Sequence, residues 1–182
     1  QIERQYGKGA VMKSIEEKLK VLSKITERFN QAHIHWAVGG SLLLYLKGYT
    51  DWFNDIDLLI YDNDAGRAKE LMMELGQMRV LDRNCYRAEH FYIFDVDEVE
   101  VDIMGDYYVP KDGVEQRIAL EKDAQIEWIH LGGQMVPLDS IPMWRRHYDV
   151  MGRQGKVDMI DKILCVTKIA CSKSKSRNQS RI

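Results

Sequence analysis

The feature that most constrains this chain is a pair of aspartates set into an apolar strand. Residues 55–61 read DIDLLIY, a short apolar run that predicts a β-strand. Side chains alternate along a strand, so Asp55 and Asp57 point to the same face. Carboxylates in a buried strand destabilise it unless another group offsets their charge. The nature of that compensating group indicates what the strand is for.

A second strand repeats this arrangement of carboxylates. In the stretch VEVDIM at 99–104, the apolar residues face one way, and Glu100 and Asp102 face the other. If the two strands are sheet neighbours, three or four carboxylates crowd together and cannot all stay ionised without a cation. Oxygen ligands suit Mg²⁺ or Mn²⁺. We therefore expect one of these ions at Asp55, Asp57 and Asp102. Glu100 is expected further along the strand, in solvent.

A glycine-rich turn precedes the aspartates by one short helix. Gly39, Gly40 and Ser41 join a strand predicted over 34–38 to a helix predicted over 41–48. At a helix N-terminus the backbone N–H groups lack helical partners and attract an anion, and glycine lets a phosphate approach closely. The Ser41 hydroxyl can donate to that phosphate or cap the helix. The turn and the carboxylates together predict a site for a metal–triphosphate.

Hydrophobic periodicity predicts an α/β (α+β) fold, in which helices flank a mixed β-sheet. Pro137 and Pro142 mark a switch to a C-terminal helical pair. Helices are predicted over 12–31, 41–48, 62–76, 139–151 and 156–170. Strands are predicted over 34–38, 55–61, 79–81, 90–94, 99–104, 126–131 and 134–138.

The length and composition indicate one domain with a substantial core. The chain has 182 residues, of which 45% are hydrophobic and 30% charged. We expect a core domain over 1–138, a helical segment over 139–172 packed on it, and a disordered basic tail over 173–182. The three cysteines form no close pair of the kind that holds zinc, so we expect reduced thiols.

Charge and hydropathy narrow the range of partners. A net charge of −2 argues against a protein that coats DNA or RNA. No stretch approaches the roughly 20 apolar residues of a membrane span, and no signal peptide is recognised. We therefore expect a cytoplasmic protein without a membrane partner, with a homo-oligomer as one option.

In this order, the motifs resemble those of the nucleotidyltransferase superfamily related to DNA polymerase β. The sequence has VGGS at 38–41, then thirteen residues, then DID at 55–57, then the later strand with Asp102. The resemblance covers residues 34–104. Small members of the superfamily include antibiotic nucleotidyltransferases, minimal nucleotidyltransferases and toxins that modify macromolecules. The stretch MGRQGKVDMIDKI at 151–163 resembles a helical segment of some bacterial members more weakly.

The resemblance implies a metal-dependent enzyme with an NTP as substrate. It implies that Asp55, Asp57 and Asp102 bind the metal and that the turn at 39–41 holds the triphosphate. An acceptor hydroxyl would attack the α-phosphate and release pyrophosphate, with the third carboxylate able to take the proton. We expect a small-molecule acceptor rather than RNA or protein. One departure is DWFN at 51–54, where many antibiotic-modifying members carry a basic residue.

Two alternatives remain open on the sequence alone. The chain could be a nucleotide-binding or antitoxin-like module that keeps the fold without turnover, or a toxin acting on tRNA or protein. A basic stretch could neutralise phosphate charge, although a solvated helix face is the simpler interpretation of Arg145, Arg146, Arg153 and Lys156. Three further residues could meet a ligand but are more simply surface or rim positions, namely Trp52, Arg87 and His90.

Overall fold

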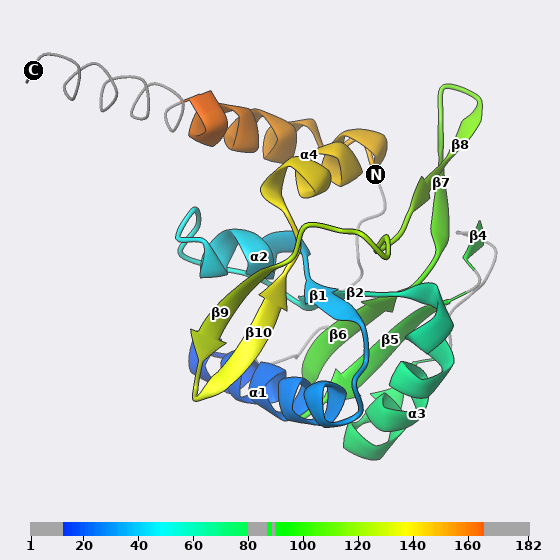
Figure 1. The fold of residues 1–182 in the computed structure, drawn as a ribbon. Coiled ribbons are helices and arrows are strands. Elements are labelled where there is room, and N and C mark those ends of the chain that lie inside the picture. Colours follow the sequence, from blue (N-terminus) through cyan, green and yellow to red (C-terminus); the bar gives the residue numbers. More distant parts are fainter. Residues whose placement is uncertain (1–12, 80–86, 89, 166–182) are drawn as a thin grey trace, which may run out of the picture.

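The computed structural model describes residues 13–79, 87–88 and 90–165, and Figure 1 shows their arrangement. The helical elements are α1 (Ile15–Gln31), α2 (Gly40–Leu46), the 3₁₀ helix η1 (Asp62–Asp64), α3 (Ala65–Leu75) and α4 (Ile141–Val150). A further helix runs over 154–165. The strands are β1 (Trp36–Val38), β2 (Ile56–Ile60), β3 (Gln77–Met78), β4 (Arg87–Ala88), β5 (Phe91–Val96), β6 (Val99–Met104), β7 (Tyr107–Lys111), β8 (Val114–Ile118), β9 (Glu127–Leu131) and β10 (Gln134–Leu138).

Seven strands form one mixed sheet in the order β3-β5-β6-β2-β1-β10-β9. β2 is parallel to β6 and β1 is parallel to β10, whereas the other neighbours are antiparallel. α1 and α3 contact each other on one side of the sheet, and α2 and α4 contact each other on the opposite side (Figure 1). The sheet and its helices confirm the α/β (α+β) class. Because β1 and β2 are antiparallel, the C-terminal end of β1 and the N-terminal end of β2 lie side by side at the same end of the sheet.

Local sequence sets where the first helices begin and end. Ser14 and Glu17 form a capping box at α1, in which the Ser14 hydroxyl accepts from the Glu17 N–H and the Glu17 carboxylate accepts from the Ser14 N–H. α2 ends just before Gly48, whose positive φ takes the chain out of the helix. The apolar stripe of α1 is buried in the core, at Val21, Leu22, Ile25 and Phe29.

One hairpin is absent from the strand predictions. β7 and β8 pair with each other and, through β7, with β4 in a separate three-stranded sheet. Their connection contains Asp112 and Gly113, both with positive φ, the dipeptide that favours a two-residue hairpin turn. The signal is therefore in the sequence, but Pro110 obscures the strand pattern before it. The strand predicted over 79–81 lies earlier, as β3, and 80–81 fall outside the described residues.

The C-terminal helical pair is present as predicted. Gly152, with a positive φ, lies between α4 and the helix over 154–165. The Arg145 guanidinium joins the two helices by donating to the Asp161 carboxylate at 2.6 and 2.7 Å. The division between 1–138 and 139–172 stays a prediction, and the tail at 173–182 lies outside the described residues. None of the described helices has the length and apolar character needed to cross a membrane.

Candidate metal and nucleotide site

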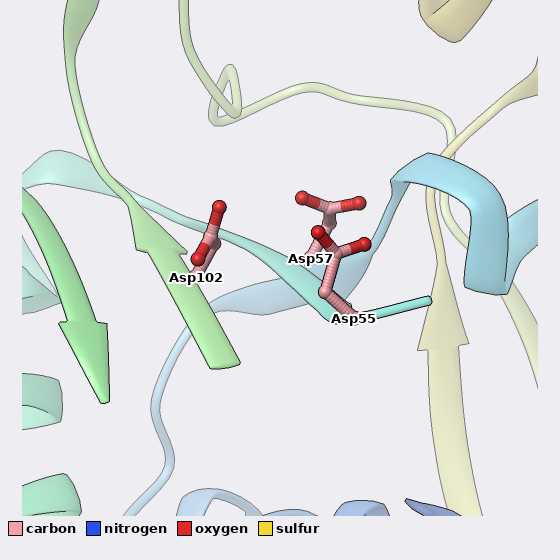
Figure 2. Close-up of side chains that lie close together, drawn as sticks. All are labelled: Asp55, Asp57 and Asp102. Carbon is pink, nitrogen blue, oxygen red and sulfur yellow. The ribbon is translucent and has the colours of Figure 1, made fainter. Parts of the chain in front are cut away.

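Three carboxylates converge on one side of the sheet (Figure 2). β2 and β6 are parallel neighbours, and their register places Asp57 beside Asp102. Asp55 lies immediately before β2. One oxygen from each of Asp55, Asp57 and Asp102 lies within 4.8 Å of the others, and we call these three residues the carboxylate site. The condition set in the sequence analysis, that the two strands are sheet neighbours, is met.

Glu100 belongs to a different group of side chains. It pairs in register with Asp95 of β5, and the Arg79 guanidinium contacts both carboxylates. The Arg79 Nε donates to Asp95 at 2.6 Å. We call Arg79, Asp95 and Glu100 the arginine cluster. Glu100 precedes Asp102 by two residues on β6 and lies away from the carboxylate site, as expected. It is half-buried and ion-paired rather than solvated.

The carboxylate site is largely shielded from water. Asp102 is 2% exposed and Asp55 is 9% exposed, whereas Asp57 is partly exposed. Tyr148 of α4 is buried in the same region: burial raises the pKa of its phenol above the usual range, and the charges of Asp57 and Asp55 add to that shift. Carboxylates this close together favour a cation among them. Their all-oxygen donor set fits Mg²⁺ or Mn²⁺.

The glycine–serine turn lies against the carboxylate site. Gly40 has a positive φ, and a Cβ there would overlap the Asp57 carboxylate, so this position requires glycine. Gly39 donates its N–H to the Asp57 carbonyl at 2.9 Å, and a Cβ on Gly39 would overlap the Trp144 indole. Ser41 does not cap α2, whose N-cap is Gly39. The buried Ser41 Oγ has no hydrogen-bond partner among the described residues, which leaves it available to a ligand.

α4 and the connection that leads into it bring buried polar side chains to this turn, and no local pattern reveals them. The rings of Trp144 and His147 meet edge-on, with centroids 5.1 Å apart. Burial lowers the pKa of His147 to about 4, and the charge of Arg146 adds to that shift. Burial raises the pKa of Asp139 to about 6, against the effect of the hydrogen bond from the next backbone N–H at 2.7 Å. Periodicity assigns Trp144 to the core, but its place on the turn depends on long-range packing.

Other residues singled out in the sequence lie outside the carboxylate site. Of the basic stretch, Arg145 is ion-paired to the following helix, whereas Arg146 and Arg153 are exposed. The His90 ring contacts a tyrosine hydroxyl at 3.0 Å. The side chain of Arg87 lies outside the described part of the chain. The described side chains, those of Arg145, Arg146, Arg153 and His90, fit the simpler interpretation of surface and structural residues.

The chain is similar to several solved structures. TM1012 of Thermotoga maritima, named as a nucleotidyltransferase, is 25% identical, with a TM-score of 0.64 over 84% of this chain and 95% of that one. The antibiotic-resistance factor ANT(2'')-Ia is 14% identical, with a TM-score of 0.60 over 92% of this chain and 95% of that one. The lincosamide antibiotic adenylyltransferase LnuA is 11% identical, with a TM-score of 0.53 over 79% of this chain and 96% of that one.

At the level of sequence, no protein-family model and no curated protein matches the chain. The likeness is therefore one of three-dimensional arrangement, over most of both chains in each case. The chain has the fold of the nucleotidyltransferase superfamily, which confirms the resemblance carried by its motifs. Fold alone does not establish a reaction, so the function is argued from the site.

Proposed function

We propose that this chain, a protein of nucleotidyltransferase fold, transfers a nucleoside monophosphate from an NTP to a hydroxyl-bearing acceptor and releases pyrophosphate. The proposal is carried by the position of three carboxylates beside a glycine turn (Figure 2). An acidic group alone could be structural, and a glycine turn alone could be a simple reversal of the chain. Side by side, they suit the opposite charges of a metal ion and a triphosphate.

Each part of the site has a role in this proposal. Asp55, Asp57 and Asp102 hold Mg²⁺ or Mn²⁺, and such an ion would stabilise negative charge on the reacting phosphate. The positive-φ Gly40 and Ser41, at the N-terminus of α2, present backbone N–H groups to the triphosphate. Gly39 shapes the turn instead, since its own N–H is donated to the Asp57 carbonyl. The Ser41 hydroxyl, which has no partner among the described residues, donates to a phosphate oxygen.

The transfer step forms a bond between the acceptor oxygen and the α-phosphorus. It breaks the bond from that phosphorus to the oxygen that bridges to the β-phosphate, and the electron pair leaves with pyrophosphate. The acceptor hydroxyl gives its proton to a carboxylate acting as general base. We assign that role to Asp102, the carboxylate that faces the other two from the neighbouring strand.

A small-molecule acceptor is the favoured class. ANT(2'')-Ia has been solved in complex with adenylyl-2''-tobramycin, and LnuA has been solved with lincomycin bound. The net charge of −2 offers no general electrostatic attraction for RNA. A tRNA or protein acceptor, as in a toxin-type nucleotidyltransferase, is the alternative that the experiment has to separate.

The test is transfer of label from each of the four α-³²P-labelled NTPs, with Mg²⁺ or Mn²⁺, to aminoglycosides, lincosamides, a metabolite extract, tRNA and protein. Pyrophosphate release is followed in parallel, with Asp57→Asn as the control. We expect a labelled small molecule and pyrophosphate with the wild type only. NTP binding without release would identify a binding module, and label on tRNA or protein would identify the toxin-type activity. Absence of NTP binding would overturn the proposal.

A further inference from the structure

α1 buries one lysine beneath the segment that leads into the carboxylate site. Lys18 is 4% exposed, and lysine is seldom buried to this extent unless its charge has partners. Two other lysines of the same helix, Lys20 and Lys24, lie at the surface in ion pairs with acidic side chains. The burial of Lys18 is therefore a property of its position and not of the helix as a whole.

The Lys18 ammonium contacts the segment 51–54, which we call the DWFN segment. The Lys18 ammonium donates to the Phe53 carbonyl at 2.8 Å. It also lies 4.0 Å from the centroid of the Trp52 ring, within the range of a cation–π contact. The segment is ordered by its own side chains as well, since the Trp52 indole N–H donates to Asn54 at 3.1 Å. Lys18 thus ties this segment to α1.

The ammonium also acts on the first carboxylate of the site. Burial lowers the pKa of Lys18, and the negative charge of Asp55 opposes that shift. Asp55 follows the DWFN segment directly, so the hydrogen bond to Phe53 holds the ammonium close to the point where the carboxylate leaves the backbone. The cation near Asp55 therefore comes from a residue that precedes Phe53 by 35 positions.

We propose that Lys18 is a positioning residue of the carboxylate site, which tethers the DWFN segment and balances the charge of Asp55 while no divalent cation is bound. The inference rests on the proposed metal site and deepens it. The Lys18 ammonium is buried and is held by the Phe53 carbonyl and the Trp52 ring. In this proposal it therefore acts on the site through Asp55 and does not touch the substrate. The ammonium and the metal ion are then alternative counter-charges, and loss of one increases the protein's dependence on the other.

The first experiment measures that dependence in the full chain. Thermal melts are recorded for the wild type, Lys18→Gln and the matched surface control Lys20→Gln, in EDTA and in saturating Mn²⁺. We expect K18Q to melt about 4–8 °C lower in EDTA, and its Mn²⁺-induced rise in Tm to exceed the wild-type rise by about 3 °C. K20Q should match the wild type in both conditions. A Mn²⁺-induced rise in K18Q no larger than in the wild type would overturn the proposal.

The second experiment needs no metal and therefore separates this proposal from the proposed function. Asp55→Asn is introduced into the wild type and into K18Q, and all four proteins are melted in EDTA. Because Asp55 loses its counter-charge in K18Q, we expect D55N to be more favourable there by about 3 °C. Additive effects of the two substitutions would refute the role of Lys18. If Mn²⁺ does not change the Tm of the wild type, that result would count against the metal site, whatever the comparison of these four proteins shows.

Two further variants cover the case in which K18Q does not fold. Lys18→Arg keeps the charge and should fold with the wild-type response to Mn²⁺. The double variant K18Q/D55N removes both charges, and recovery of folding there would support the proposal. If K18Q/D55N also fails to fold, Lys18 serves the packing of α1 independently of Asp55, and the proposal is wrong.

Discussion

Two groups of acidic side chains on the same sheet are balanced in different ways. In the arginine cluster, the Arg79 guanidinium contacts both carboxylates. In the carboxylate site, two residues further along β6, three carboxylates lie within 4.8 Å of one another. The nearby Lys18 ammonium donates to a main-chain carbonyl instead of lying among them. A guanidinium of the chain lies between the acids of the first group, whereas we propose that a divalent cation binds among those of the second.

We interpret this difference as one between acidic residues that serve stability and acidic residues that serve the proposed metal site. A guanidinium fixed between two carboxylates strengthens the folded state through charge-assisted hydrogen bonds. We expect three carboxylates held together to lower the stability of the folded state until a cation binds, a loss that is typical of functional sites. Substitutions in the two groups should therefore have opposite effects on stability, and only those in the carboxylate site should change metal binding.

The largest expected effect comes from exchanging one acid in each group for its amide. Asp57→Asn removes a proposed ligand, so Mn²⁺ affinity in the presence of NTP should fall by about 100-fold or more. In EDTA its Tm should be equal to or above that of the wild type, because repulsion is relieved. Glu100→Gln should leave Mn²⁺ affinity unchanged and lower the Tm. Calorimetry and thermal melts check both, and equal Mn²⁺ affinities in D57N and wild type would remove the distinction.

A second substitution disturbs the carboxylate site without removing an acid. Gly40→Ala places a Cβ against Asp57 at a positive φ, so we expect a loss of about 3 kcal/mol of stability and weaker Mn²⁺ binding. Gly113→Ala at the hairpin tip has a positive φ but open space, so its loss should be about 1 kcal/mol. Urea unfolding measures both. Comparable losses in the two variants would show that Asp57 does not constrain Gly40.

Asp139 and His147 are buried titratable groups near the carboxylate site, and burial favours the neutral form of each. Their effect on stability therefore depends on pH. Burial raises the pKa of Asp139 from 3.8 to about 6, so the folded state binds more protons than the unfolded state between these values. Its contribution to stability therefore falls as pH rises from about 4 to 6. Burial lowers the pKa of His147 from 6.5 to about 4, so its contribution rises with pH in that window.

These opposite slopes can be separated by substitution. Relative to the wild type, Asp139→Asn should gain stability between pH 4 and 6, by about 3 kcal/mol at most. Relative to the wild type, His147→Gln should lose a similar amount between pH 4 and 6.5. Urea unfolding at half-unit pH steps measures both differences. A difference that does not vary with pH would mean that the group titrates alike in the folded and unfolded states.

The smallest expected effect is in the arginine cluster. Arg79→Met should lower stability by about 1 kcal/mol, because the guanidinium and its two partners are partly exposed and their attraction is screened by solvent. Mn²⁺ affinity should not change. The exposed pair of Arg28 and Glu74, 3.7 Å apart, provides a control, since Arg28→Met should have almost no effect. A change in Mn²⁺ affinity in R79M would show that the two acidic groups are coupled.

The carboxylate site was within reach of sequence reasoning because it depends on a local rule. Alternation along a strand places Asp55 and Asp57 on one face, and the same pattern at Asp102 needs only one further assumption, that the two strands pair. The glycine turn is likewise local, because Gly39 and Gly40 directly follow a strand. The structure adds a reason for Gly40 beyond phosphate access, namely the Asp57 carboxylate against it.

What sequence reasoning missed depends on contacts between distant segments. The period of α1 places Lys18 on the apolar face, four residues before Leu22, and Lys20 on the opposite face, but it does not reveal the DWFN segment that contacts Lys18. The position of Trp144 on Gly39 similarly needs the path of β10 beside β1. The β7–β8 hairpin is a different case, since its Asp112–Gly113 turn is a readable signal.

The fit of Trp144 over Gly39 bears on how this chain could be shortened or split. A fragment ending at 138 would retain all three carboxylates and the whole glycine turn, yet it would expose the backbone that the indole covers. If the turn binds a nucleotide as proposed, α4 is part of that site and not a removable appendage. Separately produced halves, 1–138 and the remainder, should each be incomplete, and complementation on mixing would restore the turn and the site together.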